Sequence, residues 1–167
     1  MSDRAAALAA SFEQANTRVI EAIEFCSEEQ LQTLCPDEGW SAVVTAHHLA
    51  LSYPAIAGMV QMLATGEMGA DFSLADLDAF NAQHAKEFAN VSREETLVLL
   101  RQNGKAAADL VRGFTDEQLD RSAVLSFTDG QPWSAADLTE RGLIGHPLDH
   151  GQHILTALGM EAPAPAR

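Results

Sequence analysis

Apolar residues recur three or four positions apart through most of this 167-residue chain, which is the spacing of one face of an α-helix. The alternation of apolar and polar residues that marks a strand is nowhere sustained. Alanine and leucine dominate the composition, and both favour helices. The periodic segments are residues 5–25, 41–64, 74–89, 92–111 and 134–159. We therefore expect an all-α fold, a four-helix bundle with short connecting helices.

Local signals mark where the shorter elements lie. Capping boxes, in which Ser or Thr is followed three residues later by Gln or Glu, open helices at Ser27, Ser92 and Thr115. Pro54 lies inside the 41–64 segment and is expected to bend that helix. Residues 125–132 contain a Thr-Asp-Gly turn and are the one place where we expect a pair of strands.

Two parts of the sequence resemble each other. Residues 25–31 and 114–119 both begin with Phe and end in Glu-Gln-Leu, and each is followed by a Trp-Ser pair, at Trp40 and Trp133. In each copy a short capped helix and a loop lead to the start of a long helix. An internal repeat would relate the two halves of a bundle in this way. A chance recurrence of capping sequences would produce the same match.

Length, charge and cysteine usage exclude several classes of protein. The length suits one domain, expected over residues 1–160, and the Pro-Ala stretch 161–167 is expected to be a loose tail. The net charge of −14 repels phosphate backbones and anionic lipid, so we expect no nucleic-acid partner and no membrane. No apolar run approaches the roughly 18 residues of a membrane span. Cys26 and Cys35 fit no CxxC motif, and a cytoplasmic protein with reduced thiols is expected.

Three histidines close to the C-terminal end share one helix face. His146 and His150 are four residues apart, so both rings emerge about one turn apart, within reach of a single metal ion. His153 follows three residues later on the same face. A single HxxxH pair is weak evidence for a metal site, because solvated histidines recur at this spacing by chance. Three histidines within one arc of a helix favour metal binding more specifically.

The 41–64 segment offers a third candidate ligand. Its apolar stripe is Val44, His48, Leu51, Ala55, Met59 and Met62. His48 therefore points toward the expected core, where an unpaired imidazole costs free energy unless it is hydrogen-bonded or ligated. A satisfied core histidine is the competing interpretation. His47 lies on the flank of this stripe, and His84 lies on a stripe with Phe80 and Phe88, where a core or pocket role is expected.

These residues carry a family resemblance. The run from Trp40-Ser41 to His48-Leu49 resembles the first motif of the DinB/YfiT-like superfamily, and residues 146–154 resemble its second, a histidine pair four apart. The superfamily includes the mycothiol-dependent maleylpyruvate isomerases. The resemblance implies a four-helix bundle, often dimeric, whose metal ligands fall on His48, His146 and His150. It also implies one divalent metal ion, zinc or nickel, and a homodimer.

Two features of the second motif depart from the family pattern. Pro147 lies between the paired histidines, with Gly142 and Gly145 before it, so the helix is expected to kink or restart there. His153 takes the place usually held by Gln, where it would support a ligand or replace one.

Two functions compete. In the first, a metal held by the three histidines activates a thiol or water for a small-molecule substrate, as in a thiol-dependent transferase or isomerase or a hydrolase. In the second, the protein is a non-catalytic metal-binding stress-response or interaction protein. No residue is an evident general acid or base, which keeps the second function open. His47, His153 and His84 are expected to support or line the site.

Overall fold

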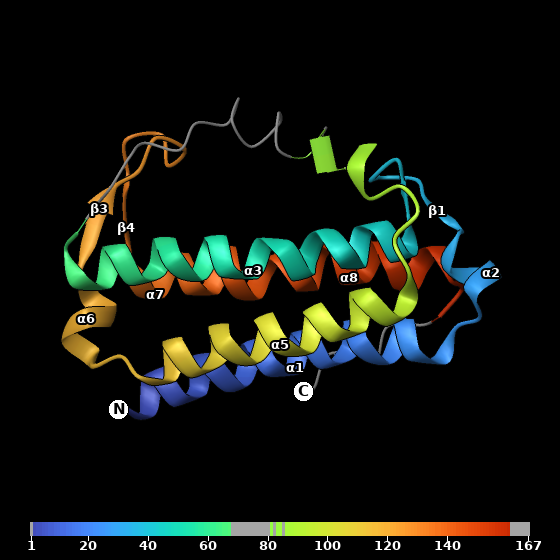
Figure 1. The fold of residues 1–167 in the computed structure, drawn as a ribbon. Helices are drawn as coiled ribbons and strands as arrows, with labels where there is room; N and C mark the ends of the chain where they lie inside the picture. The colour runs from blue at the N-terminus through green and yellow to red at the C-terminus, as the bar shows by residue number, and fades with distance from the viewer. Residues whose placement is uncertain (1, 68–80, 82, 85, 161–167) are drawn as a thin grey trace.

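The computed structural model describes residues 2–67, 81, 83, 84 and 86–160. Within them, a four-helix bundle confirms the expected fold (Figure 1). The long helices are α1 (Asp3–Phe25), α3 (Ala42–Thr65), α5 (Arg93–Arg112) and the continuous path α7 (Ala135–Leu138), η1 (Thr139–Ile144) and α8 (Gly145–Ala157). Most of the helix expected over 74–89, and the expected tail at 161–167, lie outside the described residues.

Helices α5 and α8 each pack against both α1 and α3. Figure 1 shows that α3 and α5 run in one direction along the bundle, and α1 and α8 in the opposite direction. Helices α3 and α5 are therefore parallel neighbours, and each is antiparallel to α1 and α8.

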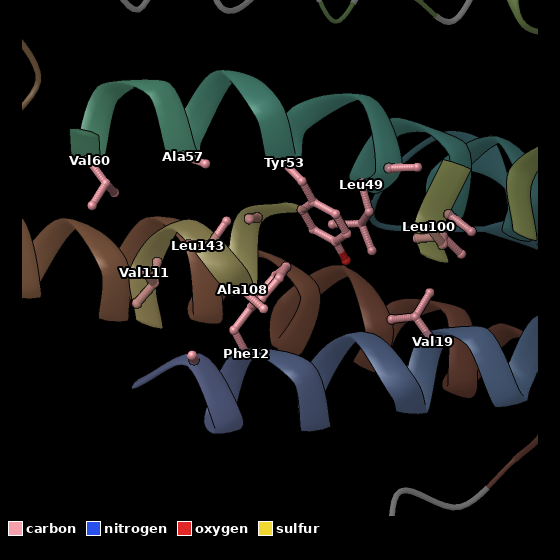
Figure 2. Packing of buried hydrophobic residues seen from close by; sticks show 14 of the residues in the cluster. Phe12, Val19, Leu49, Tyr53, Ala57, Val60, Leu100, Ala108, Val111 and Leu143 are labelled. Atoms are coloured by element: carbon pink, nitrogen blue, oxygen red, sulfur yellow. The ribbon is translucent and has the colours of Figure 1, made fainter. Parts of the chain in front are cut away.

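A buried polar network ties three helices together at the centre of the bundle. Figure 2 shows Tyr53 pointing from α3 toward α1, and its ring meets that of Phe12 edge-on with centroids 4.9 Å apart. The Tyr53 hydroxyl donates to Oδ1 of Asn16 at 3.0 Å, and Nδ2 of Asn16 donates to the Leu100 carbonyl at 3.0 Å. Gly104 of α5 leaves the room that the Asn16 amide occupies. The network fixes the register of these helices.

Helix α3 corrects one sequence interpretation. Its first nine residues, 42–50, are buried all round, so both His47 and His48 lie inside the protein. Further along, the buried face carries Tyr53, Val60 and Leu63. The expected stripe was therefore wrong in phase beyond the second turn: Leu51, Met59 and Met62 are only half-buried, and Ala55 is exposed. Apolar periodicity could not identify a buried face at the start of this helix, because every face of the helix is buried there.

Helix α3 is also long and apolar enough to cross a membrane, which the search for apolar runs did not show. The mean hydropathy is 1.3 over its most apolar 18-residue window, and 67% of that window is buried inside the structure. A helix that is apolar all round is either a membrane span or the core helix of a globular protein. The packing of α1, α5 and α8 around it makes α3 the core helix of this bundle.

The sequence repeat is confirmed as a structural one. Capping boxes open α2 (Glu28–Leu31) at Ser27 and α6 (Asp116–Asp120) at Thr115. Each short helix leads to an antiparallel hairpin, β1 (Leu34–Cys35) with β2 (Trp40–Ser41), and β3 (Ser122–Val124) with β4 (Pro132–Ser134). The second hairpin flanks the expected turn, whereas the first was not expected from the sequence. Figure 1 places the two hairpins at opposite ends of the bundle.

The last helix changes its winding just before the second motif. Residues Thr139–Ile144 form a π-helical segment, and regular α-helix resumes at Gly145. Pro147, which has no N–H to donate, lies in the first turn after this change of winding. The helix was expected to kink or restart here; instead its backbone stays helical through Gly145 and only the winding changes, and His146 and His150 lie on the first two turns of α8.

Candidate metal centre

Three imidazoles from two helices meet inside the bundle. His48 comes from the second turn of α3, and His146 and His150 come from successive turns of α8. One ring nitrogen of each lies within 4.8 Å of the corresponding nitrogens of the other two. The structure therefore brings together the three residues that the two sequence motifs selected, and their role as metal ligands remains a prediction.

The spacing of the ring nitrogens suits a shared ion. The Nε2 atoms of His48 and His146 are 3.2 Å apart. At a metal–nitrogen distance of about 2.0–2.1 Å, two ligand nitrogens of a tetrahedral or octahedral ion lie about 2.8–3.4 Å apart. His48 Nδ1 has no hydrogen-bond partner among the described residues, so this histidine is not held as a satisfied core residue. The residues present fit a divalent cation with imidazole ligands.

The buried environment keeps two of these rings in the form that binds metals. Burial, with a smaller effect from the neighbouring histidines, lowers the pKa of His48 to about 3. Burial and the nearby His150 lower the pKa of His146 to about 4. Both rings are neutral near pH 7, and only a neutral imidazole offers a lone pair to a cation.

A carboxylate that the sequence analysis did not select completes the outer side of the cluster. Glu38, in the turn between β1 and β2, has Oε1 at 2.6 Å from Nδ1 of His150 and at 2.5 Å from Nδ1 of His153. Burial opposes ionisation of Glu38, but the hydrogen bond from His153 and the nearby His150 hold the pKa of this carboxyl below its usual range. The hydrogen bond to Glu38 raises the pKa of His153.

The other two histidines form a second buried pair beside the cluster. His47 Nδ1 lies 3.0 Å from His84 Nε2, and both rings pack against Phe88. The His84 ring is also 5.4 Å from the His48 ring, and Trp40 lies against both of these rings. Burial lowers the pKa of His47, and burial with the adjacent His47 lowers that of His84 to about 4. The pair borders the three-histidine cluster without joining it.

Exposure of the histidines increases across the cluster from α3 along α8. His48 is 2% exposed, whereas the side chains of His150 and His153 are 20% and 35% exposed. Glu38 contributes a side chain that is only 10% exposed. Its position could not be read from sequence, because Asp37-Glu38-Gly39 has the composition of an ordinary turn. Only the packing of β1 against α8 brings that turn to the histidines.

Comparison with known proteins identifies a similar fold but no related sequence family. No protein-family model matches the chain, and no curated protein sequence matches it. Among solved structures, the chain is similar to YfiT from Bacillus subtilis, described as a probable metal-dependent hydrolase with an unusual four-helix bundle topology. The identity is 19%, the TM-score is 0.69, and the match covers 96% of this chain and 91% of YfiT. The expected four-helix bundle is thereby confirmed as a fold that this chain shares with YfiT.

Proposed function

We propose that this protein binds one divalent metal ion through the imidazoles of His48, His146 and His150. The observation that carries the proposal is the convergence of their ring nitrogens within 4.8 Å, from helices far apart in the sequence. Neutral imidazoles suit zinc and nickel among the common divalent ions, and one of these two is the proposed metal.

The proposed chemistry follows from the number of ligands. Three protein ligands leave at least one position for water or substrate, the arrangement of catalytic rather than structural zinc sites. A divalent cation there lowers the pKa of a bound water or thiol toward neutrality and so supplies a nucleophile. Trp40, whose ring lies 5.2 Å from that of His48, walls one side of the cluster. The Ser52 hydroxyl lies 3.5 Å from His48 Nε2 and donates to the His48 carbonyl at 2.8 Å.

We propose that the reaction is hydrolysis of a small molecule. The description of YfiT as a probable metal-dependent hydrolase, on the same fold, supports this class. Transfer or isomerisation with a low-molecular-weight thiol is the second candidate, supported by the two sequence motifs that resemble the DinB/YfiT-like superfamily. Both candidates use the same three histidines, and they differ in whether water or a thiol is the nucleophile.

Turnover by the metal-loaded protein tests this proposal. The protein is loaded with Zn²⁺ or Ni²⁺ and assayed on small esters and amides, and separately on electrophiles offered with low-molecular-weight thiols. We expect hydrolysis by the wild type and none above background by His146→Ala. Thiol-dependent product alone would support the second candidate. Equal background rates for wild type and His146→Ala in every assay would contradict both, and would favour the non-catalytic metal-binding protein.

A further inference from the structure

Glu38 is held in a fixed place beside the candidate metal centre. The backbone N–H groups of Glu38 and Gly39 both donate to the Cys35 carbonyl, at 3.1 and 3.0 Å. Gly39 has φ of +73°, a left-handed conformation that glycine adopts without strain. The tight turn aims the Glu38 carboxylate at α8, where a single oxygen, Oε1, meets two histidines.

Two roles for this carboxylate are possible, and the distances decide between them. Glu38, His150 and His153 also have ligand atoms within 4.8 Å of one another, so together they could hold an ion of their own. However, Oε1 lies only 2.6 and 2.5 Å from the two Nδ1 atoms. Ligand atoms around one cation lie about 2.8–3.4 Å apart, whereas charge-assisted hydrogen bonds to a carboxylate are short. Both contacts are therefore hydrogen bonds in which Nδ1–H donates.

We propose that Glu38 is a positioning residue that fixes His150 in the Nδ1–H tautomer and so presents its Nε2 to the metal. The proposal rests on the proposed metal centre. A neutral imidazole has one N–H and one lone pair, so an acceptor at Nδ1 leaves the lone pair on Nε2. A carboxylate in that position also orients the ring and makes Nε2 more basic.

The same turn supplies a matched control. Asp37 is the neighbouring acid, but its side chain is 73% exposed and its Oδ2 lies 3.9 Å from His153 Nε2. Asp37→Asn and Glu38→Gln remove the same charge from adjacent positions. Only the second change weakens a hydrogen bond to a proposed ligand, so a difference between the variants separates positioning from the general effect of charge.

The first measurement is the affinity for Zn²⁺, by competition with a chromophoric chelator near pH 7.5. We expect Glu38→Ala to weaken binding about 10–100-fold, the usual cost of losing such a partner. Glu38→Gln keeps an acceptor oxygen without the charge, so its affinity should lie between those of wild type and Glu38→Ala. Asp37→Asn should bind as tightly as wild type. Circular dichroism confirms that each variant is folded.

The second measurement reads the tautomer of His150 directly, from ¹⁵N chemical shifts of the metal-free protein. We expect the Nδ1–H form in the wild type and in Glu38→Gln, and a mixture in Glu38→Ala. A wild type that binds no Zn²⁺ at all would contradict the proposed function. Equal affinities of wild type and Glu38→Ala would overturn the role of Glu38 alone, as would a second Zn²⁺ per chain that Glu38→Ala removes.

Discussion

The Nε2 atoms of His48 and His146 lie 3.2 Å apart, although the two residues are 98 positions apart in the chain. His48 is buried, His146 is half-buried and both rings are neutral near pH 7, so the pair can share at most one hydrogen bond. Leaving buried polar nitrogens poorly satisfied costs free energy, and a cation between them relieves that cost. The close approach of these two nitrogens therefore favours metal ligands over ordinary core residues.

Acid is expected to destabilise the metal-free protein. The pKa values of about 3 for His48 and about 4 for His146 in the folded protein are below the roughly 6.5 of an unfolded histidine. As pH falls below about 6.5 the unfolded chain takes up protons that the folded protein does not, so stability present above that pH is lost below it. Each such group contributes up to about 1.4 kcal/mol per pH unit.

Urea unfolding in the presence of a chelator, at pH 7.5 and pH 5.0, measures this loss. Carboxylates also contribute to acid lability, so the informative quantity is the difference between wild type and His146→Gln. The variant lacks one histidine of lowered pKa and should lose up to about 2 kcal/mol less than wild type between the two pH values. An equal loss in the two proteins would show that His146 is not held in its neutral form by burial.

Metal binding is expected to change the fluorescence of one tryptophan. The Trp40 ring lies 5.2 Å from that of His48. Trp133 belongs to the other hairpin, where its ring centroid lies 4.8 Å from the guanidinium carbon of Arg141. Ni²⁺ is paramagnetic and quenches nearby indoles. Titration with Ni²⁺ should therefore give a saturable decrease in wild type and in Trp133→Phe, and little change in Trp40→Phe. The opposite pattern would place the ion at the second hairpin.

A single methyl group on Gly104 is expected to disrupt the central polar network. A Cβ there would lie 2.2 Å from Nδ2 of Asn16, so the amide must leave its bond to the Leu100 carbonyl. Gly104→Ala should lower the free energy of unfolding by about 1–3 kcal/mol. Gly58→Ala on α3 is the control, since its Cβ meets nothing within 4 Å. That variant should be unchanged or more stable by up to about 1 kcal/mol. Equal effects would show that crowding at Asn16 is unimportant.

The sequence predicted the parts of the fold that depend on local information. Helical spacing and capping residues located α1, α3 and α5 to within about two residues, because those signals lie inside each segment. The repeat of capped helix and Trp-Ser pair also predicted a shared local structure at both ends of the bundle. The hairpin that carries Glu38 was missed, since strands of two residues have no periodicity to detect.

The sequence located the histidine cluster but not its surroundings. His146 and His150 lie one helix turn apart on the same face, and this spacing alone brings them together. His48 was selected from a stripe whose phase proved wrong further along α3, yet it is buried because the whole start of that helix is covered. The contacts of Glu38 with His150, and of His47 with His84, join residues 112 and 37 positions apart. Such contacts depend on how elements pack, which a single sequence does not encode locally.

Metal content tests the central claim most directly. Wild type, His48→Ala and His84→Ala are loaded with Zn²⁺, passed through a desalting column and analysed for metal and protein. His84→Ala is the matched control, because it removes a buried imidazole that borders His48 without belonging to the ligand set. We expect about one Zn²⁺ per chain in wild type and His84→Ala, and almost none in His48→Ala. One Zn²⁺ per chain retained by His48→Ala would contradict the account.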